Sequence, residues 1–119
     1  PDDADWARAS ALELAQQDPH PGGPTPYRTE VRVLTDPLHL YLRVSSVDPE
    51  FNRRSVHTLQ RDSDQAGDDH VTVVLDTFGN HRVGYVFEVN AGGARTDGLI
   101  SPASPDPTYE WDGVWDAHV

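Results

Sequence analysis

Cysteine, methionine and lysine are all absent from this chain of 119 residues. The absence of cysteine excludes disulfide bonds and thiolate metal sites, but it leaves the compartment open, because many secreted bacterial proteins also lack cysteine. No apolar run is long enough to cross a bilayer and no signal peptide is recognisable, so we expect no membrane insertion by this segment. The start at Pro1 and a strand-like run at residues 115–119 indicate a fragment, and we expect the natural protein to continue into further domains.

Positive charge is scarce, because nine arginines stand against twenty acidic residues and the formal net charge is −11. Fifteen of the acidic residues are Asp, whose short side chain favours turns and loops. Such a surface repels phosphate backbones, which argues against nucleic acid and anionic membranes as partners. It favours neutral ligands and metal cations, although an acidic surface also serves plain solubility.

Apolar residues are sufficient for one core. They make up 36% of the chain, and the aromatic residues comprise three Trp, four Tyr and three Phe. A chain of this length buries roughly two-thirds of its unfolded surface when it folds as one unit. We therefore predict a single domain over residues 1–119.

Alternation of polar and apolar residues predicts most of the secondary structure. Residues 30–34 and 38–44 alternate on either side of Asp36-Pro37 and predict a hairpin, with the apolar side chains of the second run on one face. Further strands are predicted at residues 55–61 (a weaker signal), 70–76, 82–90 and 94–100.

Helical periodicity is missing from the body of the chain. Only residues 2–10 predict a short helical turn, with Asp2 or Asp3 as its N-cap, and the proline-rich residues 18–26 and 101–108 predict surface loops. Short strands joined by turns point to an antiparallel sandwich or barrel. We predict an all-β fold, a two-sheet antiparallel β-sandwich of jelly-roll or immunoglobulin-like type that is incomplete at the C-terminus.

Trp111 and Trp115 are candidate sugar-binding residues. A flat aromatic ring packs against the apolar C–H face of a pyranose, and on a strand a spacing of four puts both rings on one face. Asp112-Gly113 between them can instead form a turn, and either indole can cap the core, a reading that we favour for Trp115. Trp6 is expected to plug the core near the N-terminus.

Arg61, Asn90 and Asp97 are candidates for binding sugar hydroxyls. Arginine offers a fork of donors, and asparagine offers both a donor and an acceptor. Two of them also have an ordinary structural explanation: an ion pair with a neighbouring Asp for Arg61, and turn chemistry for Asn90 before Ala91-Gly92-Gly93.

Four carboxylates lie within eight residues, with Gly67 among them, and form a candidate calcium site. Calcium takes six to eight oxygen ligands, which flexible Asp- and Gly-rich loops supply. Repulsion among close carboxylates needs compensation by a cation or by water. The four are Asp62, Asp64, Asp68 and Asp69.

No catalytic motif is recognisable. The six histidines show no zinc-ligand spacing, and there is no nucleophile-elbow, phosphate-loop or dinucleotide pattern. The chain is therefore predicted to be a binding module rather than an enzyme.

Several short motifs occur in order along nearly the whole chain. They are Asp5-Trp6, residues 29–36 (TEVRVLTD), 40–44 (LYLRV), 61–62 (RD), 68–71 (DDHV), 75–78 (LDTF), 84–90 (GYVFEVN), Gly93, 97–98 (DG) and 111–115 (WDGVW). The ordered set resembles family-9 carbohydrate-binding modules, most closely those at the N-terminus of large bacterial envelope proteins. The loop at residues 61–69 is more acidic than the family pattern.

This resemblance implies a two-sheet sandwich related to the DOMON superfamily, with at least two more strands after Val119. It implies non-catalytic binding of a neutral xylan- or glucan-like saccharide, in support of an attached glycoside hydrolase or envelope protein, and often bound calcium. It also implies a location outside the cell, in the periplasm or at the outer surface of a bacterium.

Two alternatives stay open. The chain can be a docking domain of an envelope protein without sugar binding. It can also be a DOMON-type haem domain, which is the weaker alternative, because without methionine and lysine only histidine is left as an axial ligand.

Overall fold

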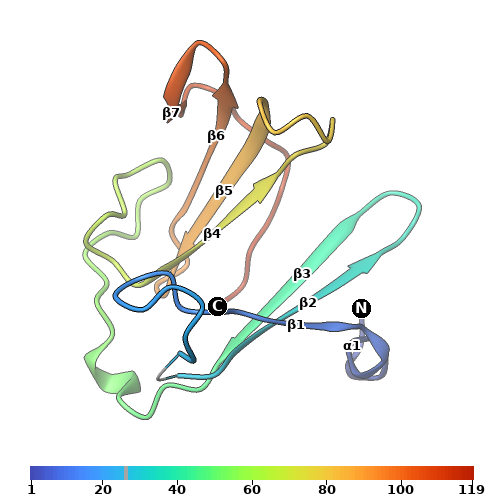
Figure 1. The fold of residues 1–119 in the computed structure, drawn as a ribbon, viewed down its shortest axis with the longest axis vertical. Helices are drawn as coiled ribbons and strands as arrows, with labels where there is room; N and C mark the ends of the chain where they lie inside the picture. The colour runs from blue at the N-terminus through green and yellow to red at the C-terminus, as the bar shows by residue number, and fades with distance from the viewer. Residues whose placement is uncertain (26) are drawn as a thin grey trace. The chain divides into compact units, whose positions relative to one another are not determined.

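The computed structural model describes residues 1–25 and 27–119, apart from the side chains of Phe51 and Pro105. The described residues form two antiparallel sheets, one short α-helix and one 3-10 helix, η1 (Phe51–Arg53), as Figure 1 shows. This confirms the predicted all-β class, two sheets with a short N-terminal helix, and is consistent with a β-sandwich. The backbone divides into two compact units, Pro1–Phe51 and Asn52–Val119. The single domain over residues 1–119 stays a prediction.

Helix α1 (Asp3–Arg8) begins at a capping box. The Asp2 side chain accepts a hydrogen bond from the Asp5 backbone N–H, and the Asp5 side chain accepts one from the Asp2 N–H. These two reciprocal bonds satisfy donors that a helix N-terminus otherwise leaves unpaired. Asp2 is therefore the N-cap, one of the two residues predicted for that position.

The first unit contains a three-stranded antiparallel sheet in the order β1-β2-β3. Its strands are β1 (Ala11–Glu13), β2 (Thr29–Thr35) and β3 (Leu40–Ser46). The register pairs Val31 with Val44 and Val33 with Leu42, so one face of the β2–β3 hairpin is apolar, as the alternation predicts. Strand β1 was not predicted, because three residues are too few to show a period.

Asp36 closes the turn between β2 and β3. Its side chain accepts hydrogen bonds from the backbone N–H groups of Leu38 and His39, and from the hydroxyl of Tyr41 at 2.8 Å. These bonds, that from Leu38 foremost, hold the pKa of Asp36 well below its ordinary value. The predicted hairpin is thus fixed by an ionised turn carboxylate.

The second unit contains a four-stranded antiparallel sheet in the order β4-β5-β6-β7. Strands β4 (His70–Leu75), β5 (Gly84–Asn90) and β6 (Arg95–Ser101) confirm three predicted strands to within two residues at each end. Strand β7 (Ser104–Thr108) pairs with β6 across an irregularity between Leu99 and Ser101.

Three predictions of secondary structure were wrong. Residues 55–61 form no strand, and residues 101–108, predicted as a loop, include β7. The strand-like run at residues 115–119 is not a strand either. β7 lies at a sheet edge, where proline is tolerated because its missing N–H is not needed by an inner neighbour.

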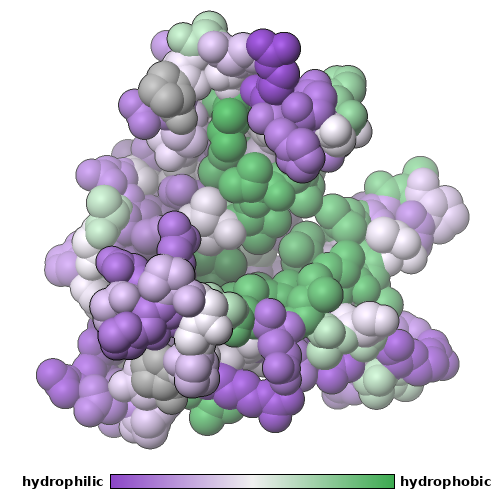
Figure 2. All heavy atoms as spheres, viewed as in Figure 1, coloured by the Kyte–Doolittle hydropathy of each residue, from purple (hydrophilic) through white to green (hydrophobic). Residues whose placement is uncertain are grey.

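The register gives the four-stranded sheet two different faces. Tyr85 and Phe87 alternate with Val86 and Glu88 along β5, and Phe87 pairs with Asp97 of β6. We call the face that carries Tyr85, Phe87 and Asp97 the aromatic face. On the side of the molecule seen in Figure 2, hydrophobic residues gather over the strands and hydrophilic residues over the loops. No helix in the described chain is long and apolar enough to cross a membrane.

Candidate functional site

Asp97 is the centre of a polar cluster on the aromatic face. It is fully buried, at 0% exposure, although it carries a carboxylate. Its Oδ1 accepts hydrogen bonds from Arg61 Nη2 at 2.8 Å and from the indole Nε1 of Trp115 at 3.0 Å, and its Oδ2 accepts one from the backbone N–H of Gly113. A carboxylate removed from water needs such donors and a counter-charge, and Asp97 has both.

Arg61 joins three carboxylates. Its guanidinium contacts Asp97 at 2.8 Å, Asp112 at 3.1 Å and Asp62 at 3.3 Å. Loss of hydration acts to lower the pKa of Arg61, but the charges of Asp97, Asp62 and Asp112 outweigh it and raise the pKa. Arg61 is therefore a fixed cation that ties its own loop to β6 and to the 111–115 segment.

Aromatic rings from two parts of the chain meet on the same face. Trp111 packs on Tyr85 with ring centroids 4.9 Å apart and approaches Phe87 at 6.0 Å. Trp115 meets Phe87 edge to face at 5.2 Å. The two indoles predicted to share a face thus flank one phenylalanine, although the segment that carries them is not a strand.

Gly113 lets the chain pass beneath Trp111. A Cβ at this position would lie 2.7 Å from the Trp111 ring, closer than any side chain tolerates. The absence of that atom also allows the Gly113 N–H to reach Asp97. Asp112-Gly113 therefore breaks the strand, as one of the two readings of the sequence held, and still leaves both rings on the aromatic face.

The two indoles differ in their hydrogen bonding. The Nε1 of Trp115 is used by Asp97, and Arg95 lies over the Trp115 ring at 5.7 Å while its Nη1 donates to the Trp115 carbonyl at 2.9 Å. Trp115 is thus fixed by its surroundings, in line with the structural reading favoured for it. Within the described part of the chain, no hydrogen bond occupies the Nε1 of the half-buried Trp111. Of these two indoles, Trp111 is thus the one whose Nε1 has no protein partner among the described residues.

Asn90 lies away from this cluster. It ends β5 on the face opposite to Tyr85 and Phe87, and its side-chain oxygen accepts hydrogen bonds from the N–H groups of Gly92 and Ala94. The structure therefore brings together four of the five predicted sugar-binding residues and leaves Asn90 in the turn chemistry weighed for it. The four are Arg61, Asp97, Trp111 and Trp115.

Asp68 forms a second buried cluster with Asn90. Its carboxylate accepts hydrogen bonds from Asn90 Nδ2 at 2.7 Å, from the His57 backbone N–H at 2.7 Å and from that of Thr58 at 3.4 Å. Burial acts to raise the pKa of Asp68, but these donors outweigh it and lower the pKa to about 2. Asp68 is thus ionised and fully engaged with protein donors.

The four carboxylates predicted to bind calcium do not meet in one place. Asp62 has a positive φ of 59° and pairs with Arg61. Asp64 accepts from the N–H of Ala66 and Asp69 from that of Ser55. Asp68 turns inward to the cluster described above.

Among the described residues, a different group of three carboxylates comes within metal-binding distance. Ligand atoms of Asp62, Asp97 and Asp112 all lie within 4.8 Å of one another. Arg61 contacts all three, so its guanidinium already supplies the positive charge that they need. Asp112 was missed by the sequence reasoning, and its place between the two tryptophans was the available signal. Calcium binding stays a prediction.

Ser55, His57 and Asp68 are neighbours but do not form a hydrolase triad. His57 Nδ1 lies 2.7 Å from Asp68 Oδ1 and 3.3 Å from the Ser55 hydroxyl. A triad uses the two ring nitrogens for the two partners, whereas here both partners meet the same nitrogen. The geometry gives Ser55 no general base.

Comparisons with known protein families, with curated proteins and with solved structures found no match to this chain. The resemblance to family-9 carbohydrate-binding modules therefore stays an expectation from the sequence.

Proposed function

We propose that the chain is a non-catalytic module that binds a neutral, xylan- or glucan-like saccharide at the aromatic face. The observation that carries this proposal is the convergence at Asp97 of three segments distant in sequence: Arg61, β6 and the tryptophan-bearing residues 111–115. Sugar sites combine an aromatic platform with planar polar groups, and this cluster supplies both.

Each member of the cluster has its own role in this binding. Trp111 is the platform for a pyranose ring, because its indole is half-buried, held by Tyr85 and free at Nε1 within the described contacts. Arg61 and Asp112 stand beside it as hydrogen-bonding groups, with Asp112 80% exposed at its side chain. Asp97 and Trp115 hold Arg61 and Asp112 in position and do not touch the ligand, because the Nε1 of Trp115 donates to the carboxylate of Asp97.

Charge supports a neutral ligand over a polyanion. The chain carries a formal net charge of −11, and three of the four charged groups in the cluster are carboxylates. A polyanionic chain would meet repulsion across the surface, whereas neutral sugar hydroxyls both donate to carboxylates and accept from arginine.

The wider role follows from the resemblance to family-9 modules. We propose that the domain holds an attached glycoside hydrolase or envelope protein against a polysaccharide, outside the cell or in the periplasm of a bacterium. Calcium binding at the acidic loop or at the Asp62, Asp97 and Asp112 group belongs to the same proposal and is tested with it.

The test is a titration with xylo- and gluco-oligosaccharides, with and without calcium, followed by tryptophan fluorescence and calorimetry. Trp111→Ala is expected to weaken binding by roughly tenfold or more, as loss of a stacking aromatic does. Phe78→Ala, which removes a 69% exposed aromatic ring in the turn between β4 and β5, is the control and should leave the affinity unchanged. Failure of every saccharide to bind would favour the docking domain, and a colourless purified protein would exclude bound haem.

A further inference from the structure

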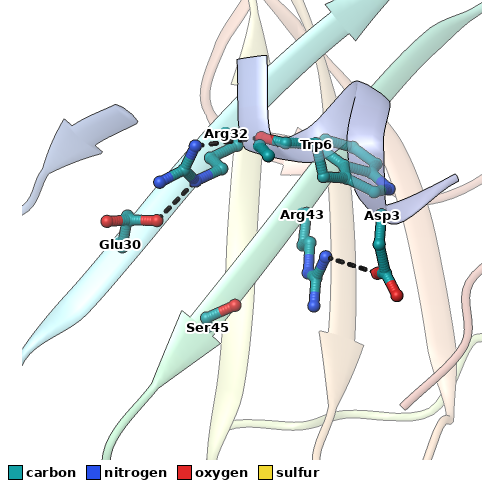
Figure 3. A pocket seen from close by; sticks show the side chains of 7 residues that line it. Asp3, Trp6, Glu30, Arg32, Arg43 and Ser45 are labelled. Atoms are coloured by element: carbon teal, nitrogen blue, oxygen red, sulfur yellow. Dashed lines mark hydrogen bonds and ion pairs between the residues drawn. The ribbon is translucent and has the colours of Figure 1, made fainter. Parts of the chain in front are cut away.

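A separate cavity of about 280 Å³ lies in the first unit, between α1 and the polar face of the β1–β2–β3 sheet. As Figure 3 shows, Trp6 comes from the helix, Glu30 and Arg32 from β2, and Arg43 and Ser45 from β3. Trp6 is therefore half-buried at a cavity wall and is not the core plug expected from the sequence. The cavity has room for about one sugar ring.

Two arginines face each other across the β2–β3 hairpin. Arg32 and Arg43 are directly paired in the register, and like charges in such a pair destabilise a sheet unless each is compensated. Arg32 is fully compensated: its Nε contacts Glu30 at 2.5 Å, and its Nη1 donates to the carbonyls of Trp6 and Ala9 at 2.9 Å each. These bonds also close the last turn of α1.

Arg43 is compensated much less well. Its described contacts are a 3.5 Å ion pair with Asp3 and a position over the Trp6 ring, 6.0 Å from the centroid. Asp3 is fully exposed at its side chain and Arg43 is 48% exposed, so water weakens this pair. Most of the five donors of the Arg43 guanidinium thus have no protein partner among the described residues, and they lie beside an indole.

The charges of the cavity lining specify the ligand charge. Two arginines and two carboxylates sum to zero, and the hydrogen bond from Arg32 holds the pKa of Glu30 below its ordinary value, so Glu30 stays ionised. If Asp3 swings away, which its exposure allows, the lining is left with one unmatched positive charge. A monoanion restores neutrality, whereas a phosphate dianion would not.

We propose that this cavity binds a carboxylated sugar unit, such as a hexuronic acid, whose carboxylate replaces Asp3 on Arg43 while its ring packs against Trp6. A planar carboxylate matches the guanidinium fork in a bidentate pair. The Ser45 hydroxyl, on the same face two residues beyond Arg43, is placed for a ring hydroxyl. This site is distinct from the aromatic face and does not rest on the function proposed there.

The test is calorimetric titration with methyl glucuronide, the matched neutral methyl glucoside, and acetate. The glucuronide is expected to bind at least tenfold more tightly than either, since it alone uses both Arg43 and Trp6. Arg43→Gln should abolish this preference, and Arg82→Gln is the charge-matched control, because Arg82 is an exposed arginine of the second unit and does not line the cavity. Trp111→Ala should leave glucuronide binding intact.

The direction in which Asp3→Asn changes glucuronide affinity decides the proposal. Removing the competing carboxylate should tighten glucuronide binding several-fold, and this gain does not depend on the folding of the Arg43 variant. Weaker or unchanged binding in Asp3→Asn would overturn the proposal. Equal affinity for glucuronide and glucoside would also overturn it, because Arg43 would then have no role in binding. Equal affinity for glucuronide and acetate would do the same for Trp6.

Discussion

Asp97 and Asp68 are both buried carboxylates in the second unit, but different partners hold them. Asp97 pairs with a cation, Arg61, and adds an indole and one backbone donor. Asp68 accepts from backbone N–H groups, the Asn90 amide and the exposed His57 ring, without an arginine partner among the described contacts.

The difference distinguishes the candidate ligand site around Asp97 from the Asp68 cluster, which stabilises the fold. Around Asp97 the compensating groups come with half-buried rings and exposed rim residues, which a ligand can reach. Around Asp68 they are the backbone of the preceding extended segment and a turn residue, so the cluster ties residues 57–58 to the end of β5. Backbone and amide groups fix the fold there, whereas the cluster around Asp97 also includes charged groups at the surface.

Asp97→Asn should have the largest effect on stability. The change removes the charge that pairs with Arg61 and one of the two acceptor oxygens, of which Oδ1 serves Arg61 and Trp115 and Oδ2 serves Gly113. We expect a loss of about 3 kcal/mol in the free energy of unfolding. Urea denaturation followed by tryptophan fluorescence measures it. Asp106→Asn, in exposed β7, is the control and should stay within about 0.5 kcal/mol. A loss as small as the control's would mean that Asp97 is not the centre of the cluster.

Asp68 should show itself in the pH dependence of stability. Its folded pKa, about 2, lies below the ordinary 3.8, so its contribution is complete above pH 4 and is lost as the pH falls towards 2. Urea midpoints measured from pH 7 to pH 2 should therefore decline more steeply in the parent protein than in Asp68→Asn. Parallel curves would show that Asp68 is not preferentially ionised in the folded state, and the contrast with Asp97 would lose its basis.

Gly113→Ala tests whether the close approach of the backbone to Trp111 and Asp97 stabilises the cluster around Asp97. The new Cβ must displace the Trp111 ring or the Gly113 N–H that Asp97 accepts, for an expected loss of about 1–3 kcal/mol and a weaker saccharide response. Gly67→Ala is the matched control beside Asp68, because its Cβ would meet only the His57 ring at an ordinary 3.5 Å. Equal losses in the two variants would contradict a special role for the close approach at Gly113.

The predictable part of the fold is the part with a long period-two pattern. Strands β2, β3 and β5 carry alternating residues, β4 is a β-branched run, and β6 follows the Ala91-Gly92-Gly93 turn, and all five were predicted. β1 is too short for a period, and β7 carries the proline-rich sequence SPDPT, which is typical of a loop. Its strand character comes from pairing with β6, a tertiary effect that no local pattern contains.

The candidate site was predictable by residue type but not by arrangement. Arg61, Trp111 and Trp115 each had an ordinary structural explanation, and only the fold shows that hydrogen bonds and ring contacts join them with Asp97 in one cluster. One signal in the sequence was overlooked. Side chains alternate between the two faces of a strand, so Asn90 lies on the face of β5 opposite to Tyr85 and Phe87.

Asp112→Asn should have the smallest effect on stability and the most selective effect on binding. Its side chain is 80% exposed and its pair with Arg61 is a surface one, so the free energy of unfolding should change by less than about 1 kcal/mol. If the rim of the aromatic face holds the ligand, saccharide affinity should nevertheless fall several-fold, because a carboxylate accepts from sugar hydroxyls more strongly than an amide does. Calorimetric titration beside urea denaturation separates the two quantities, with Asp116→Asn as the control that removes an exposed carboxylate paired to Arg95 instead. If both variants lost the same affinity, the ligand would not contact Arg61 and Asp112. The contacts of the aromatic face would then stabilise the fold alone, like those of the Asp68 cluster.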